Sequence, residues 1–110
     1  MAKKKDIPDE IQRSAEEVVA RFNSEHLDDV DVRYIVCFKG SYLYLDRSDF
    51  GRSDRICRLK YSGDFADWEF AIFKFSSETY DPDEWMFPGS DDVDGSIEGA
   101  MLAGLEAYPP

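Results

Sequence analysis

Residues 32–46 read Val32-Arg33-Tyr34-Ile35-Val36-Cys37-Phe38-Lys39-Gly40-Ser41-Tyr42-Leu43-Tyr44-Leu45-Asp46. Apolar and polar side chains alternate on both sides of the central Gly40-Ser41 pair, as they do in strands that bury one face. A two-residue connection with Gly first is typical of a type II′ turn, because Gly readily adopts the positive φ that this turn requires. The segment therefore predicts a β-hairpin with strands at 32–39 and 42–46.

The turn also predicts the register of the hairpin and the face to which each side chain points. Lys39 pairs with Tyr42 and Val36 with Leu45, because the length of the turn sets the alignment of the two strands. One face then carries the hydrophobic set that must form the core, namely Val32, Tyr34, Val36, Phe38, Leu43 and Leu45. The other face, which we name the second face, carries Arg33, Ile35, Cys37, Lys39, Tyr42, Tyr44 and Asp46.

Beyond this hairpin, we expect a polar loop over Arg47–Arg55 around Gly51 and then two more strands. The third strand, Ile56–Tyr61, alternates again. Its side chains divide into Cys57, Leu59 and Tyr61 on one side and Ile56, Arg58 and Lys60 on the other. The fourth strand, Trp68–Ser76, is apolar on both sides, which is typical of a strand that is covered on both faces.

Apolar residues at helical spacing mark both ends of the chain. A first helix is expected from about Pro8 to His26, with Asp9 and Glu10 in its first turn, where acids complement the helix dipole. A second helix is expected at Ile97–Tyr108. Asp94 and Ser96 precede this second helix as candidate N-caps. We also expect a short helical turn at Tyr80–Trp85, with Asp81 as its N-cap and Pro82 after it.

The order of elements is helix, four-stranded meander, loop and helix, which predicts an α+β fold. An antiparallel sheet with both helices packed on one face buries the apolar stripes economically. The last helix carries the small residues Gly99, Ala100, Ala103, Gly104 and Ala107, so we expect its backbone to approach the sheet or the first helix closely. We expect residues 1–5 to form a flexible basic tail and residues 6–110 a single α+β domain.

The chain is acidic, with a formal net charge of −11 at pH 7 and a pI near 4.4. Residues 76–110 contain nine acidic side chains and no Lys or Arg, whereas residues 32–75 contain eight basic and six acidic side chains. A net negative field repels polyanions, which argues against general affinity for nucleic acid or anionic membranes. The composition is 43% hydrophobic and 15% aromatic, which argues against a disordered chain.

The sequence also bears on location. No apolar run approaches the roughly 18 residues that a membrane-spanning helix needs. The basic residues at 3–5 are not followed by the apolar stretch of a secretory signal, so we expect a cytoplasmic protein. Cys37 and Cys57 lack the spacing of a metal or redox pair and are expected to be buried free thiols.

Tyr42, Tyr44, Arg58 and Lys60 are candidate binding residues on the second face. Aromatic and cationic side chains interleaved on a sheet bind single-stranded nucleic acid in some domains, although the order of elements here differs from the usual module. The same residue types are ordinary on a solvated antiparallel face. Three interpretations stay open, namely a solvated face, a face covered by residues 77–95, and a surface for a nucleic acid or protein partner.

Residues 77–95 carry Trp85, Met86 and Phe87 inside an acidic frame. If this segment crosses the second face, its aromatic rings fill the gap and its carboxylates approach Arg58 and Lys60. If the rings are exposed instead, Trp85 and Phe87 are candidate contacts for a protein partner, because large aromatic side chains dominate the energetics of many interfaces.

Two acidic clusters raise the question of metal chemistry. Residues 92–97 match the middle of a calcium-binding EF-hand loop, but Met101 stands where the bidentate Glu belongs, so Asp92 and Asp94 are a weak look-alike. Asp81, Asp83 and Glu84 are carboxylates of a kind used in acid–base or metal chemistry. No motif for a nucleophile, a phosphate loop, a dinucleotide or a Cys/His metal cluster occurs, so we expect no catalytic residues and no cofactor.

We therefore expect a small acidic binding or regulatory module without catalytic activity, which contacts a protein partner through the second face and residues 80–89. A first alternative is a small metal-dependent hydrolase or enzyme subunit that uses the acidic loop. A second alternative is a protein associated with single-stranded nucleic acid, which uses the Tyr/Arg/Lys face. The oligomeric state has no signature in the sequence.

Overall fold

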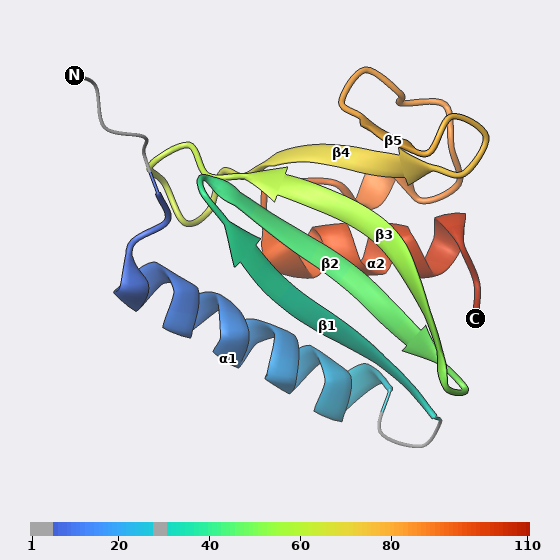
Figure 1. Cartoon of the computed structure of the whole chain (residues 1–110), viewed down its shortest axis with the longest axis horizontal. Coiled ribbons are helices and arrows are strands. Elements are labelled where there is room, and N and C mark those ends of the chain that lie inside the picture. The colour runs from blue at the N-terminus through green and yellow to red at the C-terminus, as the bar shows by residue number, and fades with distance from the viewer. Residues whose placement is uncertain (1–5, 28–30) are drawn as a thin grey trace.

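The structure is a computed structural model that describes residues 6–27 and 31–110, so the basic tail expected at residues 1–5 lies outside the described residues. Two helices pack against one antiparallel sheet, which confirms the α+β fold (Figure 1). The sheet has five strands in the order β1-β2-β3-β4-β5, so it is a meander with one more strand than expected. In chain order, the helices, the strands and the 3-10 turn η1 are α1 Asp9–His26, β1 Val32–Lys39, β2 Tyr42–Asp49, β3 Arg52–Lys60, β4 Glu69–Lys74, β5 Thr79–Asp81, η1 Ser90–Asp92 and α2 Ile97–Ala107.

The first hairpin is as the sequence predicts. β1 pairs with β2 so that Lys39 faces Tyr42 and Val36 faces Leu45. Gly40 has a φ of +62°, as the first position of a type II′ turn requires. Leu43 and Leu45 are completely buried on the helix-covered face, and such burial stabilises a fold by about 1.5–3 kcal/mol per side chain.

The expected loop at Arg47–Arg55 is wrong, because both strands continue through it. β2 runs to Asp49 and β3 starts at Arg52, with Phe50-Gly51 as the connecting turn. Phe50 and Gly51 have φ values of +55° and +91°, the pattern of a type I′ turn. The polar composition of this segment suggested a loop, but the hydrogen bonds of a strand ladder are made by the backbone and tolerate polar side chains.

A β-bulge corrects the predicted face of Ile56. The β2–β3 register shifts between Leu45, which pairs with Cys57, and Asp46, which pairs with Arg55. Ile56 is the extra residue, and it is completely buried beside Cys57 on the helix-covered face. Simple alternation placed Ile56 with Arg58 because a single inserted residue breaks the two-residue period.

The region after β4 also differs from expectation. β4 is shorter than the predicted fourth strand, and residues 79–81 form β5 instead of the start of a helical turn. Asp81 does not cap a helix. Its Oδ1 accepts a hydrogen bond of 2.9 Å from the N–H of Asp83, which turns the chain after the strand. Tyr80 therefore becomes a sheet residue paired with Phe73.

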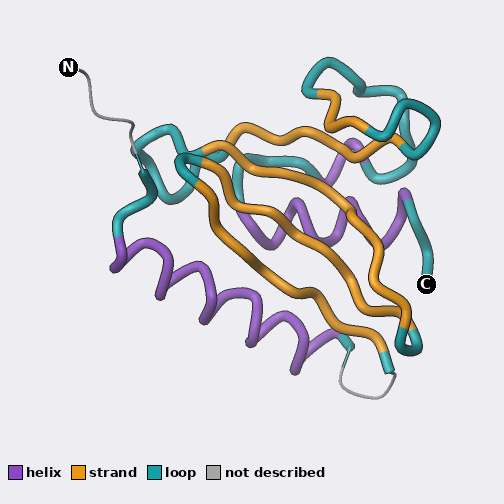
Figure 2. The backbone as a smooth tube through the Cα atoms, in the orientation of Figure 1, coloured by secondary structure: helices purple, strands orange, loops and turns teal. Residues whose placement is uncertain are grey.

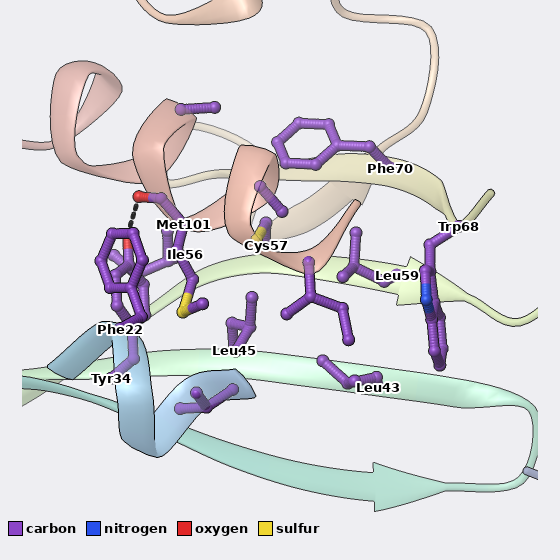
Figure 3. Close-up of a cluster of buried hydrophobic side chains, with 14 of the residues drawn as sticks. Phe22, Tyr34, Leu43, Leu45, Ile56, Cys57, Leu59, Trp68, Phe70 and Met101 are labelled. Atoms are coloured by element: carbon purple, nitrogen blue, oxygen red, sulfur yellow. Dashed lines mark hydrogen bonds between the residues drawn. The ribbon is translucent and has the colours of Figure 1, made fainter. Parts of the chain in front are cut away.

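Both helices lie on the same side of the sheet and enclose the core (Figures 2 and 3). Helix α1 runs along β1, and the Asn23 side chain bonds both backbone groups of Tyr34 at 2.8 and 3.0 Å, which occupies part of this sheet edge. Helix α2 is held from the sheet side by Tyr34, whose hydroxyl donates to the Met101 carbonyl at 2.6 Å. Neither helix in the described ranges has both the length and the apolar character that crossing a bilayer demands.

The small residues of α2 bring its backbone against the sheet, as expected. A Cβ atom at Gly104 would lie 2.5 Å from Cγ2 of Ile56 and would overlap the Tyr34 hydroxyl. The start of α2 is also as expected, because the Ser96 side chain accepts a hydrogen bond of 2.9 Å from the N–H of Gly99. Gly104 therefore sets how closely α2 can approach β1 and β3.

The buried charge of Arg47 joins β2 to the end of α2. Arg47 is 1% exposed, and its Nε and Nη2 donate to the Asp49 carboxylate at 2.7 and 3.2 Å. The same guanidinium donates to the Gly104 carbonyl at 3.3 Å and to the Tyr108 carbonyl. These carbonyls lie at the negative end of the helix dipole, where a cation is stabilising. Arg47, expected in a loop, is therefore a core residue and a helix cap.

Replacement of Arg47 by Met is expected to destabilise the protein by roughly 3–5 kcal/mol, because it leaves the mostly buried Asp49 carboxylate without its partner. The matched control is Arg52→Met. Arg52 also pairs with an acid two residues away, but its side chain is 82% exposed, so its loss should cost within about 0.5 kcal/mol. Urea unfolding measures both, and equal losses for the two variants would contradict the role given to Arg47.

Gly104→Ala is expected to lower the free energy of unfolding by about 1–3 kcal/mol, because the added methyl group overpacks the contact with Ile56 and Tyr34. Helix propensity alone predicts the opposite, a gain of about 1 kcal/mol. Leu102→Ala, on the exposed side of the same helix, is the control and should change stability by about 0.5 kcal/mol or less. A stabilised Gly104→Ala protein in urea unfolding would show that α2 does not approach the sheet this closely.

Candidate binding surface on the second face

The second face is the side of the sheet opposite the two helices. The strand registers place Tyr42 beside Lys60 and Tyr44 beside Arg58, so the four residues predicted from the sequence lie together. Tyr80 joins them from β5, at the position where a helical turn was expected. The sequence signal that could have identified Tyr80 is the alternation in Glu78-Thr79-Tyr80-Asp81, which is too short to distinguish from a turn.

Three tyrosines and one arginine form a closed cluster on this face, which we name the tyrosine–arginine cluster. The Tyr44 ring lies 6.1 Å from Tyr42 and 5.5 Å from Tyr80, measured between ring centroids. The Arg58 guanidinium lies 4.4 Å from the Tyr42 centroid and 5.4 Å from the Tyr80 centroid. Each member thus contacts two others, and such cation–π contacts contribute about 0.5–1 kcal/mol at exposed sites.

The cluster is continued by a second cation and ring. Phe73 lies 5.1 Å from Tyr80, and the Arg55 guanidinium lies 5.6 Å from the Phe73 centroid. Burial and then the charge of Asp46 raise the pKa of Tyr80 to about 12, so its hydroxyl is a neutral donor at physiological pH. The surface therefore offers fixed rings with hydrogen-bonding hydroxyls between permanent positive charges.

Positive charge exceeds negative charge on the second face, although the whole chain carries −11. The registers place the carboxylates Asp46 and Glu69 on this side, and two more lie near cations at its edges, Asp31 by Arg33 and Glu78 by Arg55. The cations on the same side are Arg33, Lys39, Arg55, Arg58 and Lys60. This surface is therefore electrostatically complementary to an acidic partner.

Trp85 and Phe87 do not belong to this surface. Both pack on Phe70, with centroid distances of 6.2 and 5.8 Å, and Phe70 belongs to the core on the helix-covered side. The interpretation in which residues 77–95 cover the second face is therefore wrong, apart from Tyr80. Trp85 remains about half exposed and Met86 almost fully exposed, so residues 82–88 present a separate apolar surface.

The acidic loop is organised around Lys74. Its Nζ lies 3.0 Å from Oε1 of Glu84 and 3.7 Å from Oδ2 of Asp81. Among the residues that the structure describes, no group of three or more His, Cys, Asp or Glu side chains is arranged to hold a metal ion. Asp94 instead accepts hydrogen bonds from the N–H and the hydroxyl of Ser96, in support of the start of α2.

The two cysteines are free, as expected, but only Cys57 is buried. Cys37 is exposed on the second face, so the prediction that both thiols are buried is wrong. Desolvation, which is complete at Cys57 and partial at Cys37, followed by the charge of Asp46, raises the pKa of both thiols, so neither has the lowered pKa of a reactive cysteine.

Comparisons with known proteins add no assignment. No protein-family model matches the chain, and no match is found among curated proteins or solved structures. The function is therefore inferred from the geometry and charge of this chain.

Replacement of Lys74 by Met is expected to raise the pKa of Glu84 toward its ordinary value of 4.5. The hydrogen bond from Lys74, followed by that from the Met86 N–H, holds this pKa below 4.5, so the ion pair is present at neutral pH and is lost as the pH falls through the lowered pKa. Carboxyl NMR measures the titration. Lys60→Met removes a lysine from the other face and should leave the Glu84 titration unchanged, and equal effects of the two variants would contradict the assigned contact.

Proposed function

We propose that this protein is a small binding module of the cytoplasm, without catalysis of its own, that holds an acidic segment of a protein partner on its second face. The observation that carries the proposal is the tyrosine–arginine cluster, Tyr42, Tyr44, Arg58 and Tyr80, set among further cations on an uncovered sheet face. Aromatic and arginine side chains are the types enriched at protein interfaces.

The centre and the rim of the second face would contribute to binding in different ways. The rings of Tyr42, Tyr44 and Tyr80 provide rigid apolar area that requires little further ordering on binding. Lys60 and Arg55 are exposed near them, where they can meet carboxylates of the partner and accelerate its approach. An acidic peptide with interspersed apolar residues matches both features.

A protein partner fits this surface better than single-stranded nucleic acid. Base stacking needs a free ring face, but the Arg58 guanidinium already lies over the rings of Tyr42 and Tyr80. Tyr44 meets its two neighbours at interplanar angles of 43° and 60°, so the three rings do not form a flat platform. The net charge of −11 also repels a polyanion at long range.

The alternative of a metal-dependent hydrolase has weaker support. Its candidate carboxylates Asp81 and Glu84 are both directed to Lys74, which supplies the positive charge that a metal would otherwise provide.

The cytoplasmic location is supported by two free thiols, because exposed cysteines such as Cys37 stay reduced in that compartment.

The test is an amide NMR titration with a short peptide of alternating Glu and Leu residues at about 0.01 M ionic strength, repeated at about 0.15 M. We expect shifts at Tyr42, Tyr44, Arg58 and Tyr80 that weaken at the higher ionic strength. A Gln/Leu peptide of the same length tests the need for charge, and an oligothymidylate of the same length tests nucleic acid.

Lys60→Glu should weaken binding of the Glu/Leu peptide by about fivefold to tenfold, since it places like charges together at the rim. Arg21→Glu is the matched control, because Arg21 is also an exposed cation but lies on α1, and the variant has the same net charge. Equal weakening by both variants would show that net charge alone governs binding. Tighter binding of the oligothymidylate would replace the protein partner by nucleic acid.

A further inference from the structure

A cavity of about 610 Å³ lies where the end of the β2–β3 hairpin meets the C-terminal end of α2, away from the tyrosine–arginine cluster. This volume is within the range of small-molecule sites, about 300–1,000 Å³. We name it the hairpin-end cavity. Its accessible apolar walls are formed by Phe50, Phe75, Tyr108, Pro109 and Pro110.

Phe50 is held in an unfavourable backbone conformation at this cavity. Its φ is +55°, in the left-handed region, which is unusual for a bulky aromatic residue. The first central position of a type I′ turn favours Asn, Asp or Gly. The Phe50 ring is nevertheless 66% exposed and stacks on no described aromatic ring, so packing within the chain offsets little of this strain. Backbone strain that is not offset by packing is typical of residues at ligand-binding sites.

A second exposed ring stands at the same cavity. Phe75, just after β4, is 49% exposed and meets Tyr108 edge-on at a centroid distance of 5.0 Å. Tyr108 is fixed in turn by a hydrogen bond of 2.5 Å from its hydroxyl to the Phe73 carbonyl. One side of the Phe75 ring therefore packs against Tyr108, and another side is exposed.

The four charged side chains of the cavity form two ion pairs. Arg47 is paired with Asp49 and Arg52 with Asp54, so the lining carries no net charge from these four residues. The Arg52–Asp54 pair is long, at 3.3 Å, and exposed, so it remains available to a polar group of a ligand. A neutral molecule suits this lining better than an ion.

We propose that the hairpin-end cavity binds a flat, uncharged aromatic molecule that carries one polar group, held between Phe50 and the Phe75–Tyr108 pair. Aromatic rings favour offset-stacked and edge-to-face partners, which these side chains offer. The polar group is directed to Arg52 and Asp54. This ligand differs from the acidic partner proposed for the second face, although the two sites adjoin, because Phe75 also meets Phe73 edge-on at a centroid distance of 5.1 Å.

The test uses 2-naphthol, a planar bicyclic alcohol, in an NMR titration of the whole chain. We expect shifts concentrated at Phe50, Phe75 and Tyr108. Decahydro-2-naphthol, which has the same carbon skeleton and hydroxyl but no flat ring, should bind several-fold more weakly, at about the level that loss of aromatic stacking predicts. Equal binding of the two alcohols would overturn the aromatic specificity, and absence of shifts at the cavity would overturn the site.

Phe50→Asn separates a ligand role from a structural one. Asn-Gly suits a type I′ turn, so the melting temperature should stay the same or rise, while 2-naphthol binding weakens by about tenfold. Ile35→Ser, which removes another exposed apolar side chain from β1, should leave binding unchanged. A lower melting temperature for Phe50→Asn would show that the ring serves the fold, and unchanged binding would show that it does not contact the ligand. Shifts at Phe50 on dilution of the protein alone would assign the cavity to self-association, which also overturns the proposal.

Discussion

The way helix α2 packs on the sheet depends on the contacts of the Arg47 guanidinium. It is buried between β2 and the C-terminal end of α2, where Asp49 balances its charge and the carbonyls of Gly104 and Tyr108 accept its remaining hydrogen bonds. A desolvated charge has a large penalty unless its partners keep their geometry, so this contact restricts how α2 can lie on the sheet. Two further contacts join the same helix to the sheet, namely the close approach of Gly104 to Ile56 and the hydrogen bond from the Tyr34 hydroxyl to the Met101 carbonyl.

The position of α2 also determines which surfaces remain for binding. With both helices on one side, Trp85 and Phe87 complete that side through Phe70, and the second face keeps its tyrosines and cations uncovered. The end of α2 forms one wall of the hairpin-end cavity through Tyr108, opposite the β2–β3 turn. One packing arrangement therefore produces a charged open face and a neutral cavity with different chemistry.

Prediction from sequence succeeded where two independent patterns agree and failed where one residue changes the geometry. The hairpin at 32–46 is correct because turn chemistry and alternation specify the same register. Alternation predicts the wrong face for Ile56 because a bulge inserts this residue into β3, and the polar residues around Gly51 conceal a continuous strand pair. Tyr80 was missed because a strand as short as Thr79–Asp81 has too few residues to show a period.

Local chemistry in the sequence determined the helices, the first hairpin and the α+β class, because each depends on neighbours in the chain or on one turn. The strand pairing that brings Arg58 and Lys60 beside Tyr44 and Tyr42 also depends on the turn at Phe50-Gly51 and the bulge at Ile56, which the sequence did not reveal. Only the tertiary structure decided that Arg47 is buried, that Tyr80 joins the cluster and that Trp85 lies on the opposite side. Those outcomes depend on contacts between residues far apart in sequence, such as Arg47 with Tyr108 and Phe70 with Phe87. The alternation of side chains along a strand predicts the face on which each one lies. Its contacts across the core depend on how whole helices and strands pack together.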